Sequence, residues 1–538
     1  MSNNNSWKTL VPVLIGISLG LGFWVGLSFN QPVNNQSRVK SENTEFNMLS
    51  ELLNYIDVEY VDEVNKKDLI DKTVKSILNE LDPHSYYISP EEFAEMNEPL
   101  EGNFDGVGIQ FNIQNDSLVV IDPVVGGPAE KVGIKAGDRI IMVDDSLIAG
   151  VGVRNSTVLK LLKGKKGTKV HVTVARKRSD NLEFTVTRDK IPIHSVSISY
   201  MINPKIGYIK VDRFGANTFE EFSLGMNKLK KAERVIVDLR GNGGGYMNAA
   251  TNMLDGFFKK EELLVYTQGK ARSKTESLAK SPEKFKDMDV VVLIDESSAS
   301  ASEIFAGAIQ DHDRGVIVGR RSFGKGLVQE QTMWPNGSAT RLTIARYYTP
   351  SGRCIQKPYV NGSEEYNEDY MHRYETGELL SKDSIAIVDS SVYNTDNGRL
   401  VYGSGGIIPD VFIPIDTTQG SVYLNRLLYS GLVYDFAFNY TDTRRKELLA
   451  TKDYNDFISS FEIDKPLMDS FIKFASDKGI EFDEKGFNRS KEVLKKRLKA
   501  YIARNIWGDE AFYPIWNSDD NAVKAAVSLD IDETLSKQ

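Results

Sequence analysis

The chain has 538 residues, 41% of them hydrophobic and 26% charged, which predicts several globular domains because one hydrophobic core rarely holds so long a chain. The formal net charge is -9 with acidic and basic residues interspersed, which argues against a protein that binds nucleic acid through phosphate contacts. The single cysteine, Cys354, excludes an intramolecular disulfide and a cysteine-rich metal site.

Residues 10–29 form an uncharged, mostly apolar run that as a helix would span a hydrocarbon core of roughly 30 Å. Lys8 is the only charged residue before this run, so the positive-inside rule keeps residues 1–9 in the cytoplasm and exports the residues after 29. We therefore expect a retained transmembrane signal anchor at residues 10–29. A cleaved signal peptide is the alternative, although residues 30–33 offer no small-residue cleavage site.

A polar linker is expected over residues 30–44, followed by a helical region over 45–100. Within that region, apolar residues at helical spacing predict two helices between Glu45 and Leu81. A proline after the second helix interrupts the pattern, and Pro90 suits the first turn of a further helix.

Residues 101–189 change to short apolar strands with glycine-rich turns, and this segment, with GIKAGDRI in its middle, resembles a PDZ domain. Gly106, Val107, Gly108 and Ile109 stand at the start of an expected edge strand. Free backbone N–H groups there would bind the C-terminal carboxylate of a peptide, which would add as a strand alongside Ile109–Phe111. The alternative is that these glycines only form a tight turn.

Strands and helices alternate over residues 190–416, as in an α/β core with a mainly parallel sheet. A polar, aromatic-rich insertion at about 359–403 is expected at the surface of this core. Residues 417–538 are helical by period and carry lysine-rich runs. The predicted fold is a multidomain α/β protein with an inserted β-rich domain, helical N- and C-terminal regions and one transmembrane helix.

The residues with the most informative chemistry lie between Val290 and Gln329, where an apolar strand ends and small hydroxyl-bearing residues lead into an apolar-faced helix. A serine on such a strand-to-helix turn lies at the carboxyl edge of the sheet, where α/β folds build their sites. The N-terminus of the helix favours the negative charge that develops in acyl transfer. A second strand then leads to Lys325, which has a glycine on either side and can therefore approach other groups closely.

Motifs on both sides of the PDZ-like segment occur in the order typical of the C-terminal processing peptidases, and residues 81–414 resemble this family of serine proteases with a Ser-Lys dyad. The motifs are LDPHSYY at Leu81, DLRGNGGG at Asp238, SASASE at Ser298, FGKGLVQ at Phe323, YYTPSGRCIQ at Tyr347 and GIIPD at Gly406. The resemblance implies that Ser300 is the nucleophile, that Lys325 is the general base, and that Gln329 orients the lysine.

The same resemblance implies that backbone N–H groups of Ala301, Gly244 and Gly245 hold the oxyanion. Glycine suits such a loop because N–H groups can converge there without obstruction by side chains. The general base imposes a further condition, because a free lysine amine has a pKa of about 10.4 and is mostly charged at neutral pH. A shift of roughly three units corresponds to about 4 kcal/mol, so we expect Lys325 to be buried and not ion-paired.

A structural role for the serines is the first alternative. Ser300 would suit a helix cap, because Glu303 three residues later completes a capping-box pattern. Ser298 and Ser302 are expected to have only structural roles of this kind. The resemblance, rather than the local chemistry, selects Ser300 from the three.

Other catalytic chemistries find less support. The five histidines are His84, His171, His194, His312 and His372. A Ser-His-Asp triad would need one of them beside Ser300, but His312 lies about three helical turns from it. His84 is expected to stabilise a turn. No spacing resembles a zinc-protease motif or a phosphate-binding loop, so neither a metal nor a nucleotide is expected.

The resemblance implies an exported serine endopeptidase that captures protein C-termini through its PDZ-like domain and cuts the bound protein, in processing or quality control, without a cofactor. Expected partners are proteins with exposed, apolar C-termini and the bacterial inner membrane through residues 10–29, with the catalytic part in the periplasm. A homo-oligomer or an adaptor protein is a further option. The alternative function is a catalytically silent, membrane-anchored PDZ scaffold, against which the full set of Ser300, Lys325 and Gln329 argues.

Overall fold

The computed structural model describes residues 44–114, 116–176, 181–360, 362–387 and 391–536. Contacts divide the chain into two compact units, residues 1–72 and 73–538. The expected anchor at residues 10–29 and its flanking residues lie outside the described ranges, so the anchor stays a prediction. Within the described ranges, no helix is both long enough and apolar enough to cross a bilayer.

The two helices expected between Glu45 and Leu81 are α2 (Thr44–Glu59) and α3 (Lys66–Asn79). A third helix, α4 (Pro90–Glu101), begins at the expected proline, with Ser89 as its N-cap. Between α3 and α4, where a break between helices was expected, the chain forms a short strand, β1 (Tyr86–Ile88), which was not expected. Its pairing partner lies about 250 residues further along the chain, so local periodicity could not reveal it.

The β-rich domain expected over residues 101–189 is built on a six-stranded antiparallel sheet. Its elements are β2 (Asn103–Gly106), β3 (Ile109–Gln114), β4 (Ser117–Pro123), α5 (Pro128–Lys131), β5 (Arg139–Val143), β6 (Ser146–Leu147), α6 (Asn155–Leu162), β7 (Lys169–Ala175), β8 (Leu182–Thr187) and β9 (Asp189–Pro192). The strand order is β3-β4-β5-β7-β8, with β6 paired to β5, while β2 and β9 pair with each other where the chain enters and leaves the domain. The strand at Ile109 is an edge strand, as expected.

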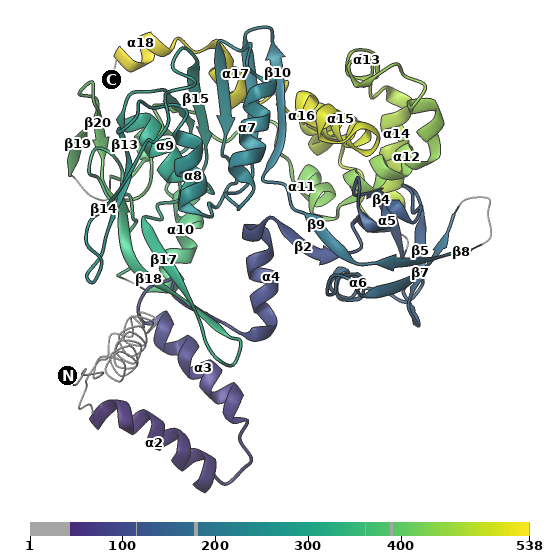
Figure 1. Ribbon diagram of the computed structural model, residues 1–538. Coiled ribbons are helices and arrows are strands. Elements are labelled where there is room, and N and C mark those ends of the chain that lie inside the picture. The colour runs from purple at the N-terminus through teal and green to yellow at the C-terminus, as the bar shows by residue number, and fades with distance from the viewer. Residues whose placement is uncertain (1–43, 115, 177–180, 361, 388–390, 537–538) are drawn as a thin grey trace, which may run out of the picture. The chain divides into compact units, whose positions relative to one another are not determined.

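The core over residues 190–416 contains a second six-stranded sheet, visible at the top of Figure 1. Its strands, in spatial order, are β10 (Val196–Asn203), β11 (Ile206–Val211), β12 (Arg234–Asp238), β15 (Asp289–Ile294), β16 (Val316–Gly319) and β21 (Val411–Phe412). The pairings from β11 to β21 are parallel, and β10 joins the edge antiparallel to β11. The crossover helices include α7 (Thr218–Lys228), α8 (Met247–Leu254) and α9 (Ala301–Asp311).

Helices cover both faces of this sheet, which explains its continuous apolar strands. In β15, Val290 and Val292 belong to the buried cluster formed with α7, α8 and α9. Val291 and Leu293 point the opposite way and pack with α17 (Asn521–Ser528). The region over 417–538 is helical, as expected, and its helix α17 also completes the core of the sheet.

A five-stranded antiparallel sheet was not expected within the α/β core. It contains β1 together with β13 (Leu263–Gln268), β14 (Thr275–Leu278), β17 (Leu327–Met333) and β18 (Ala339–Tyr348). The pairing of β1 with β18 aligns Tyr86 with Arg341. It brings the N-terminal LDPHSYY segment beside the hairpin that follows Lys325.

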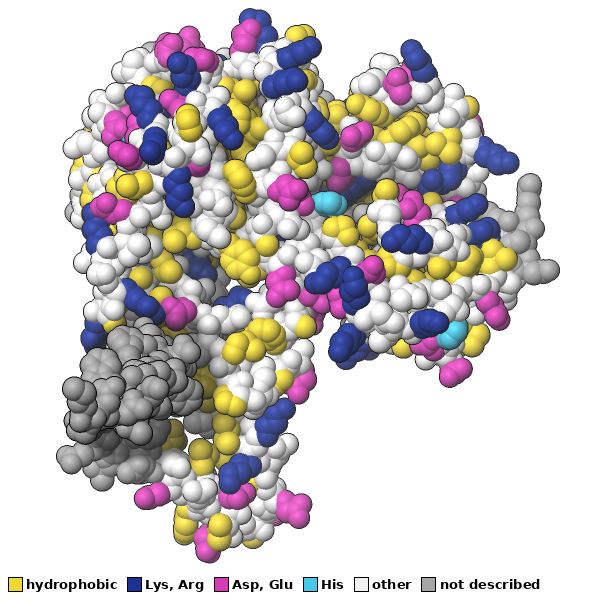
Figure 2. Space-filling model, in the orientation of Figure 1, with side chains coloured by type: hydrophobic (Ala, Val, Ile, Leu, Met, Phe, Trp, Pro, Cys, Tyr) yellow, Lys and Arg dark blue, Asp and Glu magenta, His cyan; other side chains and the backbone are white. Residues whose placement is uncertain are grey.

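The insertion at 359–403 and the C-terminal region contain the remaining elements. In the insertion these are α10 (Ser363–Glu375), a 3-10 turn (Lys382–Ser384), β19 (Val392–Asn394) and β20 (Leu400–Tyr402). In the C-terminal region they are α11 (Val422–Tyr429), α12 (Leu432–Leu448), α13 (Tyr454–Ser460), α14 (Lys465–Asp477), α15 (Glu484–Trp507), α16 (Asp509–Asn517) and α18 (Ile531–Ser536). Figure 2 shows charged side chains of both signs interspersed on the visible face, in keeping with a solvated surface.

Phe305→Ala is expected to lower the free energy of unfolding by about 3–5 kcal/mol, because Phe305 is fully buried and its removal leaves a cavity beside Phe257. Phe219→Ala, on the exposed side of α7, should cost less than about 1 kcal/mol. Urea unfolding followed by circular dichroism measures both losses. Equal losses in the two variants would contradict this account of the core.

Candidate active site

Ser300 lies at the N-cap of α9, after the turn that follows β15. Its φ is 55°, and a positive φ in a residue other than glycine costs on the order of 1–3 kcal/mol and is concentrated at functional sites. Ser300 is half-buried, and the dipole of α9 favours negative charge beside it. The backbone of the turn therefore stores strain at the serine that the family resemblance selects.

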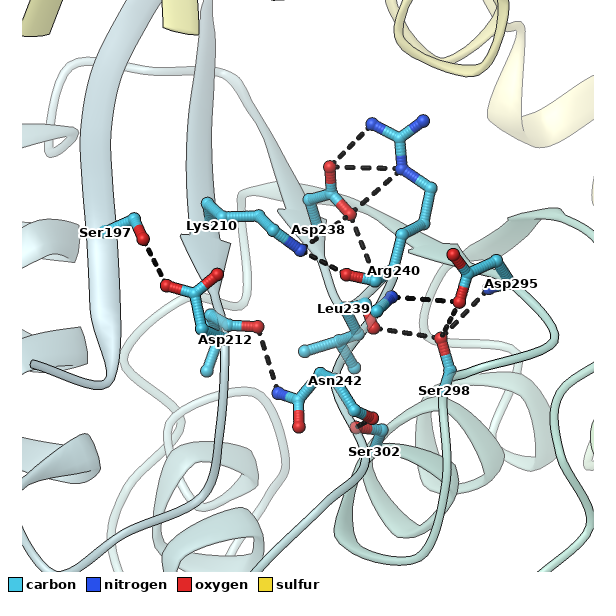
Figure 3. A network of polar contacts seen from close by, with 12 residues as sticks. Ser197, Lys210, Asp212, Asp238, Leu239, Arg240, Asn242, Asp295, Ser298 and Ser302 are labelled. Atoms are coloured by element: carbon cyan, nitrogen blue, oxygen red, sulfur yellow. Dashed lines mark hydrogen bonds and ion pairs between the residues drawn. The ribbon is translucent and has the colours of Figure 1, made fainter. Parts of the chain in front are cut away.

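The three serines of the turn differ in what their hydroxyl groups do, and Figure 3 shows the contacts of Ser298 and Ser302. The Ser298 hydroxyl donates to the Leu239 carbonyl at 2.9 Å and accepts from the Asp295 N–H, and the Ser302 hydroxyl donates to the Asn242 carbonyl at 2.8 Å. Both of these serines are fully buried. The Ser300 hydroxyl donates to no other described residue, and it faces the Glu303 N–H in the capping box that the sequence suggested. The structure thus distinguishes Ser300 from its neighbours, which local sequence could not do.

The glycine-rich loop after β12 packs directly against the serine turn. The Asn242 carbonyl accepts from the Ala299 N–H at 3.0 Å, and the Asn242 side chain donates to the Val211 carbonyl at 2.9 Å. Gly244 has a φ of 97°, and a Cβ there would lie 2.6 Å from the Ala299 carbonyl oxygen. Only glycine allows the loop to approach the turn this closely.

The three N–H groups expected to hold an oxyanion are in different situations. The Gly244 N–H donates to the Asn242 side-chain oxygen at 2.9 Å. The Gly245 and Ala301 N–H groups have no hydrogen-bond partner among the described residues. The donors available to a ligand in this structure are therefore Gly245 and Ala301.

A buried ionic cluster fixes the end of β12, where the glycine-rich loop begins (Figure 3). The Arg240 guanidinium contacts Asp238 at 2.6 Å, and the Lys210 amine lies 3.5 Å from Asp238. Arg240 also contacts Asp520 at 2.8 Å. Burial acts to raise the pKa of Asp238, but the charges of Arg240 and Lys210 hold it well below its usual range. Asp520 precedes α17, so the C-terminal region also supports this loop.

Lys325 donates a hydrogen bond from its amine to the Gln329 side-chain oxygen at 2.9 Å. Burial, followed by the positive charge of Arg341, lowers the pKa of Lys325 to about 8, while Asp82 and Glu303 oppose the shift. Within the described part of the chain, no carboxylate forms an ion pair with the amine. Lys325 is therefore without an ion pair, as expected, but it is half-buried and not fully buried.

Ser300, Lys325 and Gln329 line one cavity of about 490 Å³ together with the glycine-rich loop. Its other lining residues are Tyr86, Asn97, Leu100, Tyr246, Met247, Ile304, Leu327, Val328, Gln331, Arg341 and Tyr347. The structure therefore brings together Ser300, Lys325, Gln329 and the expected donors Gly244 and Gly245, whereas Ala301 is not one of the lining residues. The cavity is large enough for several residues of an extended peptide.

Glu303 was expected only to complete a capping box, but its carboxylate has a larger structural role. Its carboxylate is fully buried and accepts four hydrogen bonds of 2.5–2.9 Å, from the N–H groups of Ser300, Gly324 and Lys325 and from the Ser322 hydroxyl. Burial raises the pKa of Glu303 to about 7 against the effect of these donors. One carboxylate thus connects the serine turn to the lysine loop.

The histidines do not form a triad with Ser300. His312 follows the last residue of α9, where its ring contacts Asp396 and the Leu263 carbonyl, each at 2.7 Å. His84 shares a hydrogen bond with the Tyr366 hydroxyl at 2.7 Å, and burial lowers its pKa to about 4. The His84 carbonyl also accepts from the Gln329 amide. Among the described residues, no group of three or more His, Cys, Asp or Glu side chains could hold a metal ion.

The expected carboxylate-binding residues of the β-rich domain lie between β2 and the edge strand β3. Gly108 has a φ of 76° and turns the chain into β3, which pairs with β4 on one side. Val107 belongs to the same buried cluster as Val158 and Leu162 of α6. The loop Gly106–Ile109 therefore leads into a strand at the edge of the sheet, where an extended peptide can add as a further strand.

Comparison with known proteins identifies three segments of the chain. The model of peptidase family S41 matches residues 205–365, the PDZ domain model matches 106–187, and the model of a family of unknown function (DUF8443) matches 423–508.

Two bacterial proteases illustrate the sequence similarity to known proteins. The carboxy-terminal processing protease CtpA of Bacillus subtilis (strain 168) is 31% identical over 353 residues, which cover 65% of this chain and 75% of that protein. The carboxy-terminal-processing protease of Bartonella bacilliformis is 34% identical over 328 residues, which cover 58% of this chain and 74% of that protein. Among solved structures, the photosystem II D1 C-terminal processing protease is 27% identical with a TM-score of 0.33, covering 58% of this chain and 91% of that one.

Glu303→Gln is expected to lower the free energy of unfolding by about 2–4 kcal/mol, because the new amide NH₂ would face hydrogen-bond donors that now lose their acceptor. Glu220→Gln makes the same chemical change at an exposed position of α7 and should have little effect. Thermal and urea unfolding measure the difference. A Glu303→Gln protein as stable as the Glu220→Gln control would show that the carboxylate does not hold the two loops.

Proposed function

The chain belongs to peptidase family S41, and on this premise we propose that it is a serine endopeptidase that processes protein C-termini, with Ser300 as nucleophile and Lys325 as general base. The observation that carries the proposal is the shared cavity, which a strained serine, a lysine without a carboxylate partner among the described residues and Gly245, whose N–H is unpaired, line together. Gln329 orients the lysine through its hydrogen bond to the amine.

The residues suit an acyl-transfer mechanism. The neutral Lys325 amine takes the proton of the Ser300 hydroxyl as its oxygen attacks the carbonyl carbon of the scissile peptide bond. The N–H groups of Gly245 and Ala301 stabilise the oxyanion of the tetrahedral intermediate. The intermediate collapses when the C–N bond breaks, and the leaving amine receives the proton from Lys325. Water, deprotonated by Lys325, then hydrolyses the ester and restores Ser300.

The β-rich domain supplies substrate recognition in this proposal. Backbone N–H groups at Gly106–Ile109 bind the C-terminal carboxylate of a protein, and the preceding residues add as a strand to β3. The apolar surroundings of Val107 favour an apolar C-terminal side chain. A domain that binds the end of a chain delivers upstream peptide bonds to Ser300.

The location of the protein is part of the proposal. The uncharged run at residues 10–29, with Lys8 before it, supports a signal anchor in a bacterial inner membrane and a catalytic part in the periplasm. The matched relatives are bacterial proteases, which suits this placement. The proposal also allows the protein to form a homo-oligomer or to bind an adaptor protein.

Ser300→Ala should reduce hydrolysis of an unfolded protein with an apolar C-terminus by about a thousandfold or more, because no other group can form the acyl-enzyme. Ser297→Ala, an exposed serine of the same turn, should leave activity unchanged. Product formation is followed by gel electrophoresis and mass spectrometry. Equal activity of both variants would favour the PDZ scaffold with a contaminating protease over the proposed enzyme.

The pH dependence of kcat/KM should show an acid limb near pH 8, because only the neutral Lys325 amine accepts a proton and its pKa is lowered to about 8. Arg341→Met removes the charge that helps to lower this pKa, so the limb should move to higher pH by about half a unit or more. Arg346→Met, exposed on the same strand, serves as the control. A limb that stays in place in Arg341→Met would contradict the assignment of the limb to Lys325.

A further inference from the structure

The insertion at 359–403 contacts the loop that carries Lys325, although its polar sequence suggested a surface element. Its helix α10 buries two side chains, Tyr366 and Arg373, which are 4% and 2% exposed. Other aromatic residues of the same helix, including Tyr374, face solvent. The two buried side chains approach Lys325 by separate routes, one through the backbone and one through side chains.

The backbone route begins at the Arg373 guanidinium. It donates hydrogen bonds to three consecutive carbonyl groups, those of Arg321 at 3.1 Å, Ser322 at 2.9 Å and Phe323 at 3.1 Å. The next two residues are Gly324 and Lys325. Arg373 is itself held by an ion pair with Asp369 at 2.9 Å. The guanidinium therefore sets the path of the chain just before the lysine.

The side-chain route begins at the Tyr366 hydroxyl, which shares a hydrogen bond of 2.7 Å with the His84 ring. The carbonyl of His84 accepts a hydrogen bond from the Gln329 amide, whose oxygen in turn accepts from the Lys325 amine at 2.9 Å. An unbroken chain of contacts therefore runs from α10 to the amine, through a histidine that belongs to the N-terminal LDPHSYY segment.

Lys357 connects the lysine loop to α10 through its own contacts. Its amine lies 4.0 Å from the ring centre of Phe323 and 4.0 Å from that of Tyr366, and it forms an ion pair with Asp369 at 3.0 Å. Cation–π contacts strengthen when the lysine is shielded from water, as Lys357 is here. The aromatic side chain that precedes Gly324 is thus packed against α10, and the lysine loop has little freedom to move outward.

We propose that Tyr366 and Arg373 are positioning residues for Lys325, so that the inserted helix α10 is a working part of the catalytic apparatus and not a surface addition. This inference rests on the proposed role of Lys325 as general base. Proton transfer requires the amine within hydrogen-bond reach of the serine hydroxyl, and a small displacement of a catalytic group lowers rates steeply.

The pH profile distinguishes positioning from a purely structural role. The charged and titratable groups that face the Lys325 amine are Arg341 on β18, Asp82 and His84 before β1, and Glu303 on α9. Altering α10 removes none of these groups, although Tyr366→Phe takes away the hydrogen-bond partner of the His84 ring. A loosened lysine loop admits water to the amine, and solvation returns a buried lysine toward its ordinary, higher pKa. The acid limb of kcat/KM should then move to higher pH.

Tyr366→Phe is the decisive variant, because it removes only the hydroxyl that contacts His84 and keeps the ring that packs on Phe323 and Lys357. In the full-length protein it should lower kcat on an unfolded protein substrate by about tenfold, the effect of one lost hydrogen bond, and raise the acid limb. Tyr374→Phe makes the identical change about two turns further along α10, where the side chain is 52% exposed, and should match the wild type.

Arg373→Met tests the backbone route and should lower kcat further, because three hydrogen bonds are lost. If it fails to fold, Tyr366→Phe, whose melting temperature should stay near that of the wild type, still decides the question. The proposal is overturned if Tyr366→Phe and Tyr374→Phe share the wild-type kcat and pH profile while Ser300→Ala is inactive. Activity in Ser300→Ala would instead overturn the proposed function.

Discussion

Four hydrogen bonds to one buried carboxylate hold the candidate site together. Glu303 accepts from the Ser300 N–H on its own helix and from Ser322, Gly324 and Lys325 on the following loop. Burying a carboxylate is costly unless donors replace the lost water, and here they come from both loops at once. If either loop moved alone, it would leave part of this buried acceptor unsatisfied, so the serine turn and the lysine loop are fixed as one unit.

Every other support of the site attaches to this unit from a distant part of the chain. Asn242 ties the glycine-rich loop to the serine turn, and the Asp238–Arg240 pair at the end of β12 is completed by Asp520. His84, from the N-terminal part of the chain, accepts from Gln329 through its carbonyl, and its ring contacts Tyr366, 282 residues further along. The geometry of a small cavity thus depends on polar contacts between segments that are hundreds of residues apart.

The sequence predicted the parts of the fold that local patterns encode, including the turn before α9, the helices α2 and α3 and the edge strand β3. It also predicted that Ser300, Lys325 and Gln329 would lie together, through motif order. It could not predict β1 or the place of α17, because a three-residue strand and a short helix are defined by the surfaces on which they pack. The insertion was expected at the surface because its sequence is polar, and composition cannot show that polar residues such as Arg373 are buried.

A neutral lysine poses a particular problem of positioning. A carboxylate beside Lys325 would hold the amine in place, but its charge would raise the pKa and remove the base. The chain avoids this conflict because the charged side chains around the lysine bind backbone groups of its loop and not the amine. Glu303 accepts from the Lys325 N–H, and Arg373 donates to carbonyl groups just upstream, while the amine itself meets only the uncharged amide of Gln329. Strong interactions thereby fix the loop, and the amine remains free to lose its proton.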